Sequence, residues 1–216
     1  GALLLTLAPE RAPPGAGARL AAAGLRVVAG HSAATAADMA RAEAEGLVGV
    51  THLWNAMSPP TAREPGVVGA ALASARLVAG IIADGFHVAW PNVAVAARLL
   101  GERLCLVSDA MPTLAGAADG FSLEGRGIVL RDGRLTDAQG RLAGAQLPLD
   151  LAVRNMIAHA GVSPGAALRM AATNPAAALG LDGDLGRVAP GRRASLTLLD
   201  ADLRATGVVV DGVLHA

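Results

Sequence analysis

The chain has 216 residues, of which 53% are hydrophobic, and its 18 basic residues balance 18 acidic ones, so the formal net charge is zero. No apolar run approaches the roughly 20 residues that a membrane span needs, which argues against a membrane partner. Basic residues are neither in excess nor clustered, so the electrostatic footprint of nucleic-acid binding is absent from the sequence. The composition predicts a globular protein with a sizeable core, built as one domain or as a domain with a small appendage.

A single cysteine, Cys105, stands in an apolar run. One cysteine forms no disulfide framework, which indicates a reducing, cytoplasmic location. Its simplest interpretation is a small buried hydrophobic residue. The chain opens on an apolar strand pattern over residues 1–7, without an initiator methionine or a basic segment. This argues against a signal peptide, and we expect the sequence to begin inside a domain.

The first half of the chain alternates short apolar runs with helical segments. Strands are expected over residues 3–7, 25–29, 47–50, 77–83 and 104–107, and helices over 15–23, 36–45, 68–75 and 91–101. Thr35 or Ser32 is expected to cap the second of these helices, with Asp38 in its first turn. Strands that recur after roughly 20 to 30 residues with helices between them are typical of a parallel α/β sheet.

The pattern changes in the second half. The pair Asp132-Gly133 lies at the centre of residues 127–137 and predicts a β-hairpin. Helices are expected over residues 149–159, 163–172 and 175–179. A strand over 195–199 and a second hairpin at Asp211-Gly212 follow. These last strands are too few for a sheet of their own, so we expect them to complete a small β-domain.

Polar side chains follow four consecutive strands. His31, His52, His87 and Asp109 each lie at, or within a few residues of, the carboxyl end of an apolar run. In a parallel α/β barrel this rim carries the catalytic residues, because the loops converge there. His31 and His52 are separated by one strand–helix unit, so right-handed crossovers bring both imidazoles to the same end of neighbouring strands. We expect one metal ion to bind both.

These residue types suit metal-assisted hydrolysis. Two neutral imidazoles and a carboxylate form a common zinc site that leaves a position for water, whose pKa the metal lowers toward roughly 7. Asp109 suits a general base, or else a helix N-cap before Ala110. Arg63, beside proline and glycine, suits a phosphate or carboxylate partner or a solvated surface position. His159 and His215 are interpreted as structural or solvent-exposed.

Three stretches form a specific combination: Thr51-His52-Leu53 with Asn55-Ala56-Met57, then Arg63-Glu64-Pro65-Gly66, then Asp84-Gly85 with His87-Val88. Together they resemble the N-acetylglucosamine-6-phosphate deacetylase family of the metal-dependent amidohydrolase superfamily. Shorter matches over residues 6–10, 30–35, 106–110, 152–155 and 174–176 extend the resemblance nearly from end to end. Any one stretch alone points only to the wider superfamily.

The resemblance implies an α/β fold, a TIM-type (βα)8 barrel. Residues 1–180 would supply its strands four to eight, with a β-hairpin insertion near 121–141, and residues 181–216 would be the C-terminal strands of a small β-sandwich domain. The first three strands would be missing, together with a carboxylate metal ligand and a histidine that polarises the scissile carbonyl. Because such a barrel takes about 250 residues, we expect this chain to be inactive by itself.

The resemblance also implies a reaction, in which water activated by a metal removes the acetyl group of N-acetylglucosamine 6-phosphate in amino-sugar catabolism and cell-wall recycling. His31 and His52 would bind the metal, zinc first, with iron, cobalt or manganese as alternatives. Asp109 would be the general acid and base. The substrate would contact Asn55, the backbone of Ala56, Arg63 and His87, and it would be covered by Leu142, Ala143 and Gly144. Arg63 would reach the site of a neighbouring subunit in a homodimer or homotetramer.

One segment departs from the family pattern. Ala145-Gln146-Leu147-Pro148 stands where small hydroxyl residues are more usual, which leaves the detail of the covering segment open. Two other interpretations of the chain are kept. It could be another amidohydrolase acting on a different amide or a cyclic amide, or it could be an inactive fragment or relative kept for assembly or binding.

Overall fold

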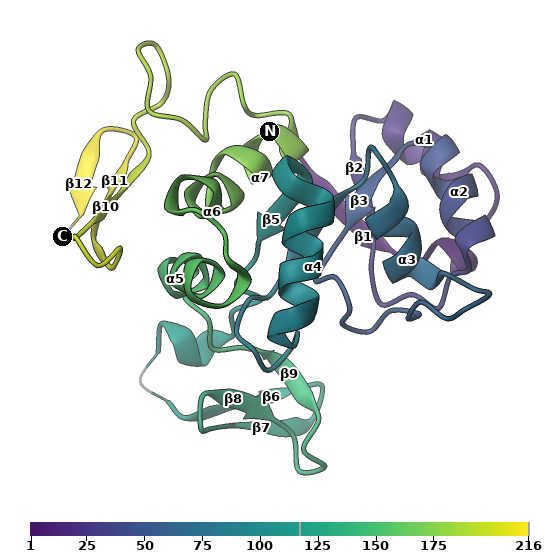
Figure 1. Cartoon of the computed structure of the whole chain (residues 1–216), viewed down its shortest axis with the longest axis horizontal. Coiled ribbons are helices and arrows are strands. Elements are labelled where there is room, and N and C mark those ends of the chain that lie inside the picture. The colour runs from purple at the N-terminus through teal and green to yellow at the C-terminus, as the bar shows by residue number, and fades with distance from the viewer. Residues whose placement is uncertain (117, 216) are drawn as a thin grey trace.

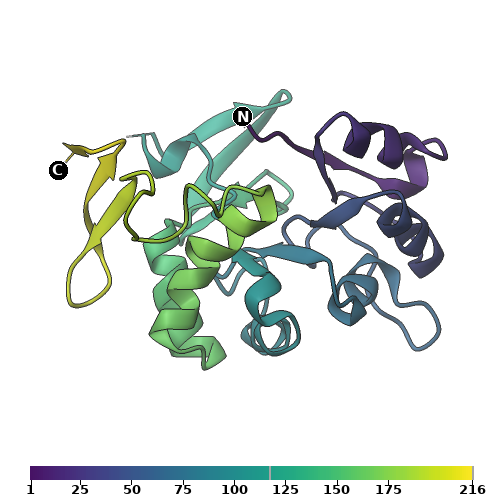
Figure 2. The same ribbon diagram turned by 90° about the horizontal axis from the view of Figure 1, so that it is seen from above.

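The computed structural model describes residues 1–116 and 118–215. Its body is a five-stranded parallel sheet in the order β1-β2-β3-β4-β5, with helices along the outside (Figures 1 and 2). The strands are β1 (Leu4–Leu7), β2 (Arg26–Ala29), β3 (Leu47–Val50), β4 (Val78–Ile81) and β5 (Leu104–Leu106), and the helices between them are α1 (Ala16–Ala22), α2 (Ala36–Ala44), α3 (Gly66–Ala73) and α4 (Trp90–Leu100). Short 3-10 helices are η1 (Pro9–Arg11), η2 (Gly101–Arg103) and η3 (Pro112–Leu114). The predicted α/β fold is confirmed.

Local hydrogen bonds explain where the helices begin. Thr35 caps α2 in a capping box with Asp38, so of the two predicted caps Thr35 is the correct one. The hydroxyl of Ser32, the other predicted cap, donates to Glu10. Helix α3 begins at Gly66, two residues before the predicted start. The reason is Ser58, whose hydroxyl and carbonyl oxygens accept the first N–H groups of the helix from Val67 and from the next residue.

The core lies between the sheet and the helices. Side chains from every strand except β1 are almost completely buried there, among them Val27, Val50, Ile81 and Leu104. Gly49 in β3 allows the next strand to approach closely, since a Cβ atom at this position would lie 2.4 Å from the carbonyl oxygen of Val78. Cys105 is buried as predicted, and burial raises the pKa of its thiol to about 11, so the thiol is neutral at physiological pH.

A second sheet follows β5. It contains β6 (Gly120–Leu123), β7 (Arg126–Arg131), β8 (Arg134–Thr136) and β9 (Leu142–Ala145), all antiparallel, and it lies below the body in Figure 1. The predicted hairpin is therefore the middle of a four-stranded sheet. Its turn residues Asp132 and Gly133 have φ values of 50° and 75°, the backbone that a type I′ turn requires. Strand β9 escaped prediction because the sequence Leu-Ala-Gly-Ala has no β-branched or aromatic residue.

Three helices and a third sheet complete the chain. The helices are α5 (Leu149–Ala160), α6 (Pro164–Ala171) and α7 (Thr173–Leu179), and the antiparallel strands are β10 (Leu196–Leu199), β11 (Ala205–Val210) and β12 (Val213–His215). Hydrogen bonds connect this sheet to α5: Arg154 donates to the carbonyl of Leu203, and Asp150 accepts the N–H of Ala205. Within the described ranges, none of the helices combines the length and the apolar character needed to cross a membrane.

The close approach of β3 and β4 predicts a selective effect on stability. We expect Gly49→Ala to lower the free energy of unfolding by about 1–3 kcal/mol, because the added methyl group has no space beside Val78. The matched control is Gly127→Ala at an exposed position of β7, where no atom lies within 4 Å of the new Cβ and a change within about 0.5 kcal/mol is expected. Denaturant unfolding of both variants measures this. Equal effects of the two substitutions would contradict the packing described here.

Candidate active site

Two histidines meet at the carboxyl ends of β2 and β3. His31 and His52 each follow their strand by two residues, and their Nε2 atoms lie 3.1 Å apart. The rings approach edge to face, with centroids 4.8 Å apart and planes inclined by 83°. The structure thus brings together the two imidazoles that the sequence placed on neighbouring strand ends.

The backbone turns sharply at the residues of this site. His31, His52 and Asp109 have φ values of 48°, 27° and 45°, in the left-handed region that non-glycine residues seldom adopt. Such a turn at a strand end directs the next residues away from the sheet. The turn at His52 is fixed on both sides, because Thr51 donates to Ala29 of β2 and Leu53 donates to Gly80 of β4. Backbone strain of this kind concentrates at functional sites.

The two histidine loops are hydrogen-bonded to each other. Ser32 donates its N–H to the carbonyl of Ala56, and Ser58 donates its N–H to the carbonyl of Ser32. Glu10, which the sequence analysis gave no role, holds the first loop from below by accepting the Ser32 hydroxyl at 2.7 Å and the Ala33 N–H at 2.8 Å. Partial burial acts to raise the pKa of Glu10, but these hydrogen bonds outweigh burial and lower the pKa below its ordinary value.

The electrostatics of His52 favour a neutral ring. Burial lowers the pKa of His52 and the neighbouring His31 lowers it further, whereas backbone hydrogen bonding and the charge of Asp109 act to raise the pKa. The Nδ1 atom of His52 is buried and has no hydrogen-bond partner within the described residues. A neutral imidazole is the form that ligates a metal ion.

The histidine pair fits a shared metal ion. Two zinc–nitrogen bonds of about 2.0–2.1 Å at a near-tetrahedral angle place their nitrogens roughly 3.4 Å apart, and the Nε2 atoms of His31 and His52 are 3.1 Å apart. No group of three or more histidine, cysteine, aspartate or glutamate side chains in the described ranges is arranged to hold a metal. The described residues therefore bring together two imidazoles, with no third side chain of these types placed to complete a metal site.

Asp109 lies three residues after β5, beside the end of β9. Its carbonyl accepts the N–H of Ala145 at 2.8 Å, and Ala110 and Ala145 form an isolated parallel bridge. The alternative role of Asp109 as a helix N-cap is wrong, because the next helical turn is η3, whose cap position is Met111. A Cβ atom on Gly144 would lie 2.4 Å from Met111 Cγ and 3.1 Å from the carbonyl of Asp109. The segment Leu142, Ala143 and Gly144 therefore lies against the Asp109 turn.

The departure at Gln146 has a structural role. Its side-chain carbonyl accepts the Thr113 hydroxyl at 2.6 Å, and its amide donates to the Thr113 carbonyl at 3.2 Å. These bonds fasten the end of β9 to η3.

Asn55 and Arg63 lie on the loop beyond His52. The Asn55 amide donates to the carbonyls of His52 and Leu53, both at 3.3 Å, so it stabilises the turn that carries the second histidine. Ala56 is exposed, with a left-handed φ of 49°. Arg63 is also exposed. Its neighbour Glu64 accepts the N–H groups of Ala36 and Gly66, which are the first residues of α2 and α3. Glu64 thereby fixes the loop on which Arg63 is presented.

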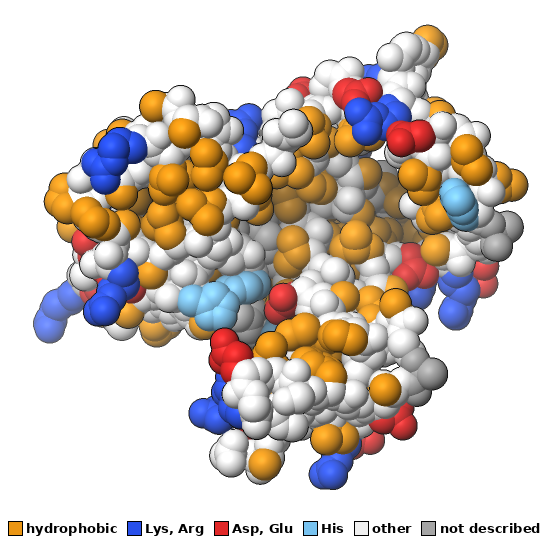
Figure 3. Space-filling view, turned by 180° about the vertical axis from the view of Figure 1, so that it is seen from behind, with side chains coloured by type: hydrophobic (Ala, Val, Ile, Leu, Met, Phe, Trp, Pro, Cys, Tyr) orange, Lys and Arg blue, Asp and Glu red, His pale blue; other side chains and the backbone are white. Residues whose placement is uncertain are grey.

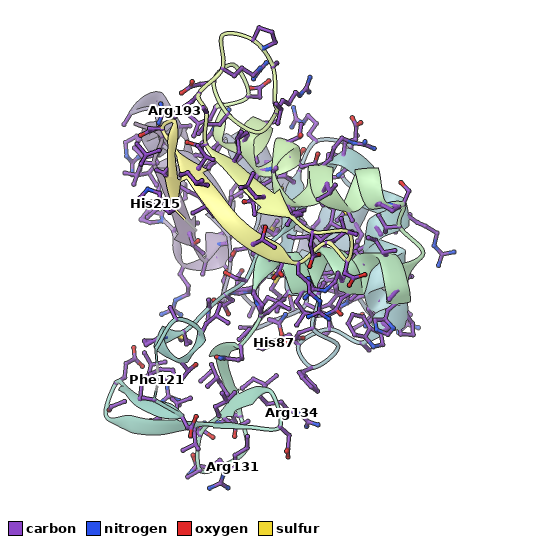
Figure 4. All side chains as sticks on the ribbon, turned by 90° about the vertical axis from the view of Figure 1, so that its left-hand side faces the viewer. His87, Phe121, Arg131, Arg134, Arg193 and His215 are labelled. Carbon is purple, nitrogen blue, oxygen red and sulfur yellow. The ribbon has the colours of Figure 1, made fainter. Side chains whose placement is uncertain are left out.

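His87 is held by a carboxylate that sequence reasoning missed. Its Nδ1 lies 2.6 Å from Oδ2 of Asp84, and its ring belongs to the segment where the body meets the β6–β9 sheet (Figure 4). No hydrogen bond between described residues links His87 or Arg63 directly to the histidine pair. A signal for Asp84 existed in the sequence, because an aspartate followed by glycine favours an Asx-turn that accepts N–H groups two and three residues later.

Neither remaining histidine is hydrogen-bonded to the histidine pair within the described residues. His159 stacks on Trp90, with ring centroids 4.3 Å apart and planes inclined by 17°, which confirms its structural interpretation. His215 ends exposed strand β12, also as expected. On the face shown in Figure 3, histidine and acidic side chains lie next to each other above the β6–β9 sheet, beside a surface hollow.

The chain combines a parallel α/β sheet with two histidines paired at the carboxyl ends of its strands, and sequence comparison gives the family. The amidohydrolase family model matches residues 18–214, so the chain belongs to this family, whose members generally depend on a divalent metal. The chain is 41% identical over 191 residues to N-acetylgalactosamine-6-phosphate deacetylase of Escherichia coli O157:H7, covering 88% of this chain and 50% of that relative. It is 37% identical over 194 residues to N-acetylglucosamine-6-phosphate deacetylase of Haemophilus influenzae, with the same two coverages.

A solved structure agrees with these relatives. The crystal structure of N-acetylglucosamine-6-phosphate deacetylase from Pasteurella multocida superposes with a TM-score of 0.95 at 36% identity, covering 99% of this chain and 56% of that chain. The resemblance read from the sequence is confirmed. The chain spans about half the length of these three proteins.

The contacts of Glu10 predict a pH-dependent contribution to stability. The pKa of Glu10 is lower in the folded chain than its ordinary value of 4.5, so ionised Glu10 stabilises the fold above that value and the contribution disappears as pH falls through the folded pKa. At neutral pH we expect Glu10→Gln to lower the free energy of unfolding by about 1 kcal/mol, because hydrogen bonds to a charged acceptor are lost.

Urea unfolding at neutral and successively lower pH measures the difference between wild type and variant. Exposed Glu102→Gln on η2 is the matched control, with no change expected. A difference for Glu10→Gln that stays constant down to strongly acidic pH would contradict the assignment.

Proposed function

We propose that this chain is part of an enzyme that removes the acetyl group from N-acetylglucosamine 6-phosphate, giving glucosamine 6-phosphate and acetate. The observation that carries the proposal is the pair of Nε2 atoms of His31 and His52, 3.1 Å apart at the carboxyl ends of neighbouring strands in the sheet whose last strand leads to Asp109. The family and the names of its relatives support this substrate class. A variant of the Mycobacterium smegmatis N-acetyl-D-glucosamine-6-phosphate deacetylase, 34% identical to this chain, was solved in complex with N-acetyl-D-glucosamine-6-phosphate.

His31 and His52 would hold a divalent ion, with zinc preferred because neutral imidazoles suit it. When bound, such an ion supplies Lewis acidity and acidifies water for attack on an amide carbonyl. Asp109 accepts the proton of the attacking water and returns it to the amide nitrogen as the carbon–nitrogen bond breaks, so that one water and one amide give an amine and a carboxylic acid. The exposed position of Asp109 leaves its carboxylate free for both transfers.

Residues around this centre would bind the sugar phosphate. Arg63 offers an exposed guanidinium for the phosphate, with Asn55 and the backbone of Ala56 beside it. His87 would contact the sugar, and Leu142, Ala143 and Gly144 would cover it from β9. We further propose that Arg63 reaches the site of a second subunit in a homodimer or homotetramer, because its own side chain projects from an exposed loop.

The domain boundaries and the location stay part of this proposal. Residues 1–180 would form part of the barrel and residues 181–216 part of a small β-domain, in a cytoplasmic enzyme. With only two metal ligands on the described residues, this chain is expected to be inactive alone. The catalytic tests below therefore use the enzyme in its full length.

A second substrate is favoured by the comparisons. The relative with 41% identity is named for N-acetylgalactosamine 6-phosphate. The relative named for its epimer, N-acetylglucosamine 6-phosphate, is 37% identical. Acetate release from both epimers, compared as kcat/KM, decides between them. Turnover of neither epimer with zinc or iron supplied would overturn the proposal and favour another amide or cyclic amide as substrate.

The proton-transfer role of Asp109 predicts a loss confined to catalysis. We expect Asp109→Asn to lower kcat by about 100- to 10,000-fold, the usual contribution of a general acid and base, while the zinc content is retained. Acetate release and metal analysis of the same preparation measure both quantities. Asp202→Asn, at an exposed carboxylate far along the chain, is the control and should keep wild-type turnover. Retained kcat in Asp109→Asn would exclude the assigned role.

The phosphate role of Arg63 predicts an effect on binding. We expect Arg63→Ala to raise KM for the 6-phosphate substrate by about 10- to 100-fold, because a charge-assisted contact is lost. Turnover of unphosphorylated N-acetylglucosamine should be unchanged. Arg98→Ala on α4, another exposed arginine, is the matched control. An equal effect of Arg63→Ala on both substrates would show that the arginine does not read the phosphate.

A further inference from the structure

The ring of His87 is held in one orientation by Asp84. The two side chains are 6% and 9% exposed, and Nδ1 of the ring lies 2.6 Å from Oδ2 of the carboxylate. The other carboxylate oxygen, Oδ1, accepts the N–H groups of Phe86 at 2.9 Å and of His87 at 2.8 Å. One carboxylate therefore closes the turn and binds the imidazole at the same time.

These contacts determine which ring nitrogen carries the hydrogen. Burial acts to raise the pKa of Asp84, but the hydrogen bonds from His87 outweigh burial and lower the pKa, so the carboxylate is ionised at neutral pH. An ionised carboxylate has no hydrogen to donate. The hydrogen in the short contact must belong to Nδ1 of His87. In the neutral form of the ring, Nε2 is then bare and is a hydrogen-bond acceptor.

The segment around the ring is held from both sides. Asn155 of α5 donates to the carbonyl of Ala83 at 2.9 Å, immediately before Asp84. On the other side, the guanidinium of Arg134 lies 4.6 Å from the centroid of the Phe86 ring, a cation–π contact that joins the segment to the β6–β9 sheet. Figure 4 shows Arg134 on that sheet and His87 above it.

The free nitrogen of His87 remains accessible. Within the described residues, Nδ1 of His52 is the one buried side-chain nitrogen or oxygen without a hydrogen-bond partner. Nε2 of His87 also forms no hydrogen bond to a described residue, but it is not among the sealed atoms, so the small exposed part of this side chain leaves Nε2 in contact with solvent. A ring that is fixed at Nδ1 and open at Nε2 is arranged to bind a ligand.

We propose that Asp84 is a positioning residue that fixes the Nδ1–H tautomer of His87, so that Nε2 accepts a hydrogen bond from a hydroxyl group of the hexosamine substrate. The identity of that ligand rests on the proposed function, whereas the tautomer is a property of the chain alone. With Nε2 as an acceptor, His87 selects a ligand group that can donate a hydrogen bond. A sugar hydroxyl can donate one, whereas a methyl ether or a deoxy position cannot.

The variant Asp84→Asn changes the tautomer of His87 while it keeps the shape of the side chain at position 84. The asparagine side chain is nearly isosteric, and its carbonyl oxygen can still accept the two backbone N–H groups. Its NH₂ group would replace Oδ2 and donate to Nδ1, which would shift the ring hydrogen to Nε2 and turn the acceptor into a donor.

Nitrogen-15 NMR of the imidazole rings, on the alkaline limb of their titration, measures the tautomer directly. We expect Nδ1–H in wild type and Nε2–H in Asp84→Asn, with the signals assigned through His87→Ala. The proposal is overturned if wild type carries the hydrogen on Nε2. The assigned wild-type spectrum gives this answer even if Asp84→Asn fails to fold.

Kinetics of the full-length enzyme test the hydroxyl contact. We expect Asp84→Asn to lower kcat/KM for the N-acetylhexosamine 6-phosphate by about 10- to 100-fold, because a donor would then face a donor. Adding His87→Ala should cause little further loss, since both changes remove one interaction. Asp150→Asn, which alters a partly buried carboxylate paired with Arg154 on α5, is the control and should keep turnover.

The outcomes separate the two proposals. If wild type turns over neither epimer, the proposed function fails while the NMR result still decides the tautomer. If wild type is active and shows Nδ1–H, but Asp84→Asn keeps its full kcat/KM, the hydroxyl contact is wrong.

Discussion

Two imidazole nitrogens held 3.1 Å apart impose the central constraint on this chain. Bringing two imidazoles this close is unfavourable by itself, because each ring loses water and gains only a ring of the same kind. Other contacts must therefore hold the pair in place. The support is the parallel register of β2 and β3 and the left-handed turn that follows each strand. His52 is the more buried of the two, so its neutral form is favoured and the repulsion that two charged rings would feel is avoided.

The supporting contacts are spread over residues distant in sequence. Glu10 holds the loop after β2, Asn55 holds the turn after β3, and Glu64 connects the beginnings of α2 and α3. Each is a polar side chain that satisfies backbone groups left unpaired where a strand or helix ends. The rim of the sheet is therefore ordered by hydrogen bonds, whereas the sheet below it is ordered by apolar packing. Metal and substrate sites on such a rim can change without disturbing the core.

The sequence predicted the regular part of this architecture well. Strand and helix positions followed from apolar runs, the cap at Thr35 and the Asp-Gly turns, because these signals act over a few residues. It also placed His31 and His52 together, since one strand–helix unit separates them. Strand β9 and the bonds of Glu10 and Asp84 were not predicted. The partners of β9 and Glu10 are set by tertiary contacts, and although the Asp84-Gly85 pair favours an Asx-turn, residue order does not show that its carboxylate also binds the His87 ring.

One contact connects the two halves of the proposed chemistry. The backbone of Asp109 is bonded to Ala145, the last residue of β9, and β9 belongs to the sheet that lies below the body of the protein. Any displacement of that sheet relative to the body would therefore displace the Asp109 turn as well. In the proposed enzyme, the sheet that brings residues 142–144 over the substrate would thus also set the orientation of the carboxylate that transfers the proton.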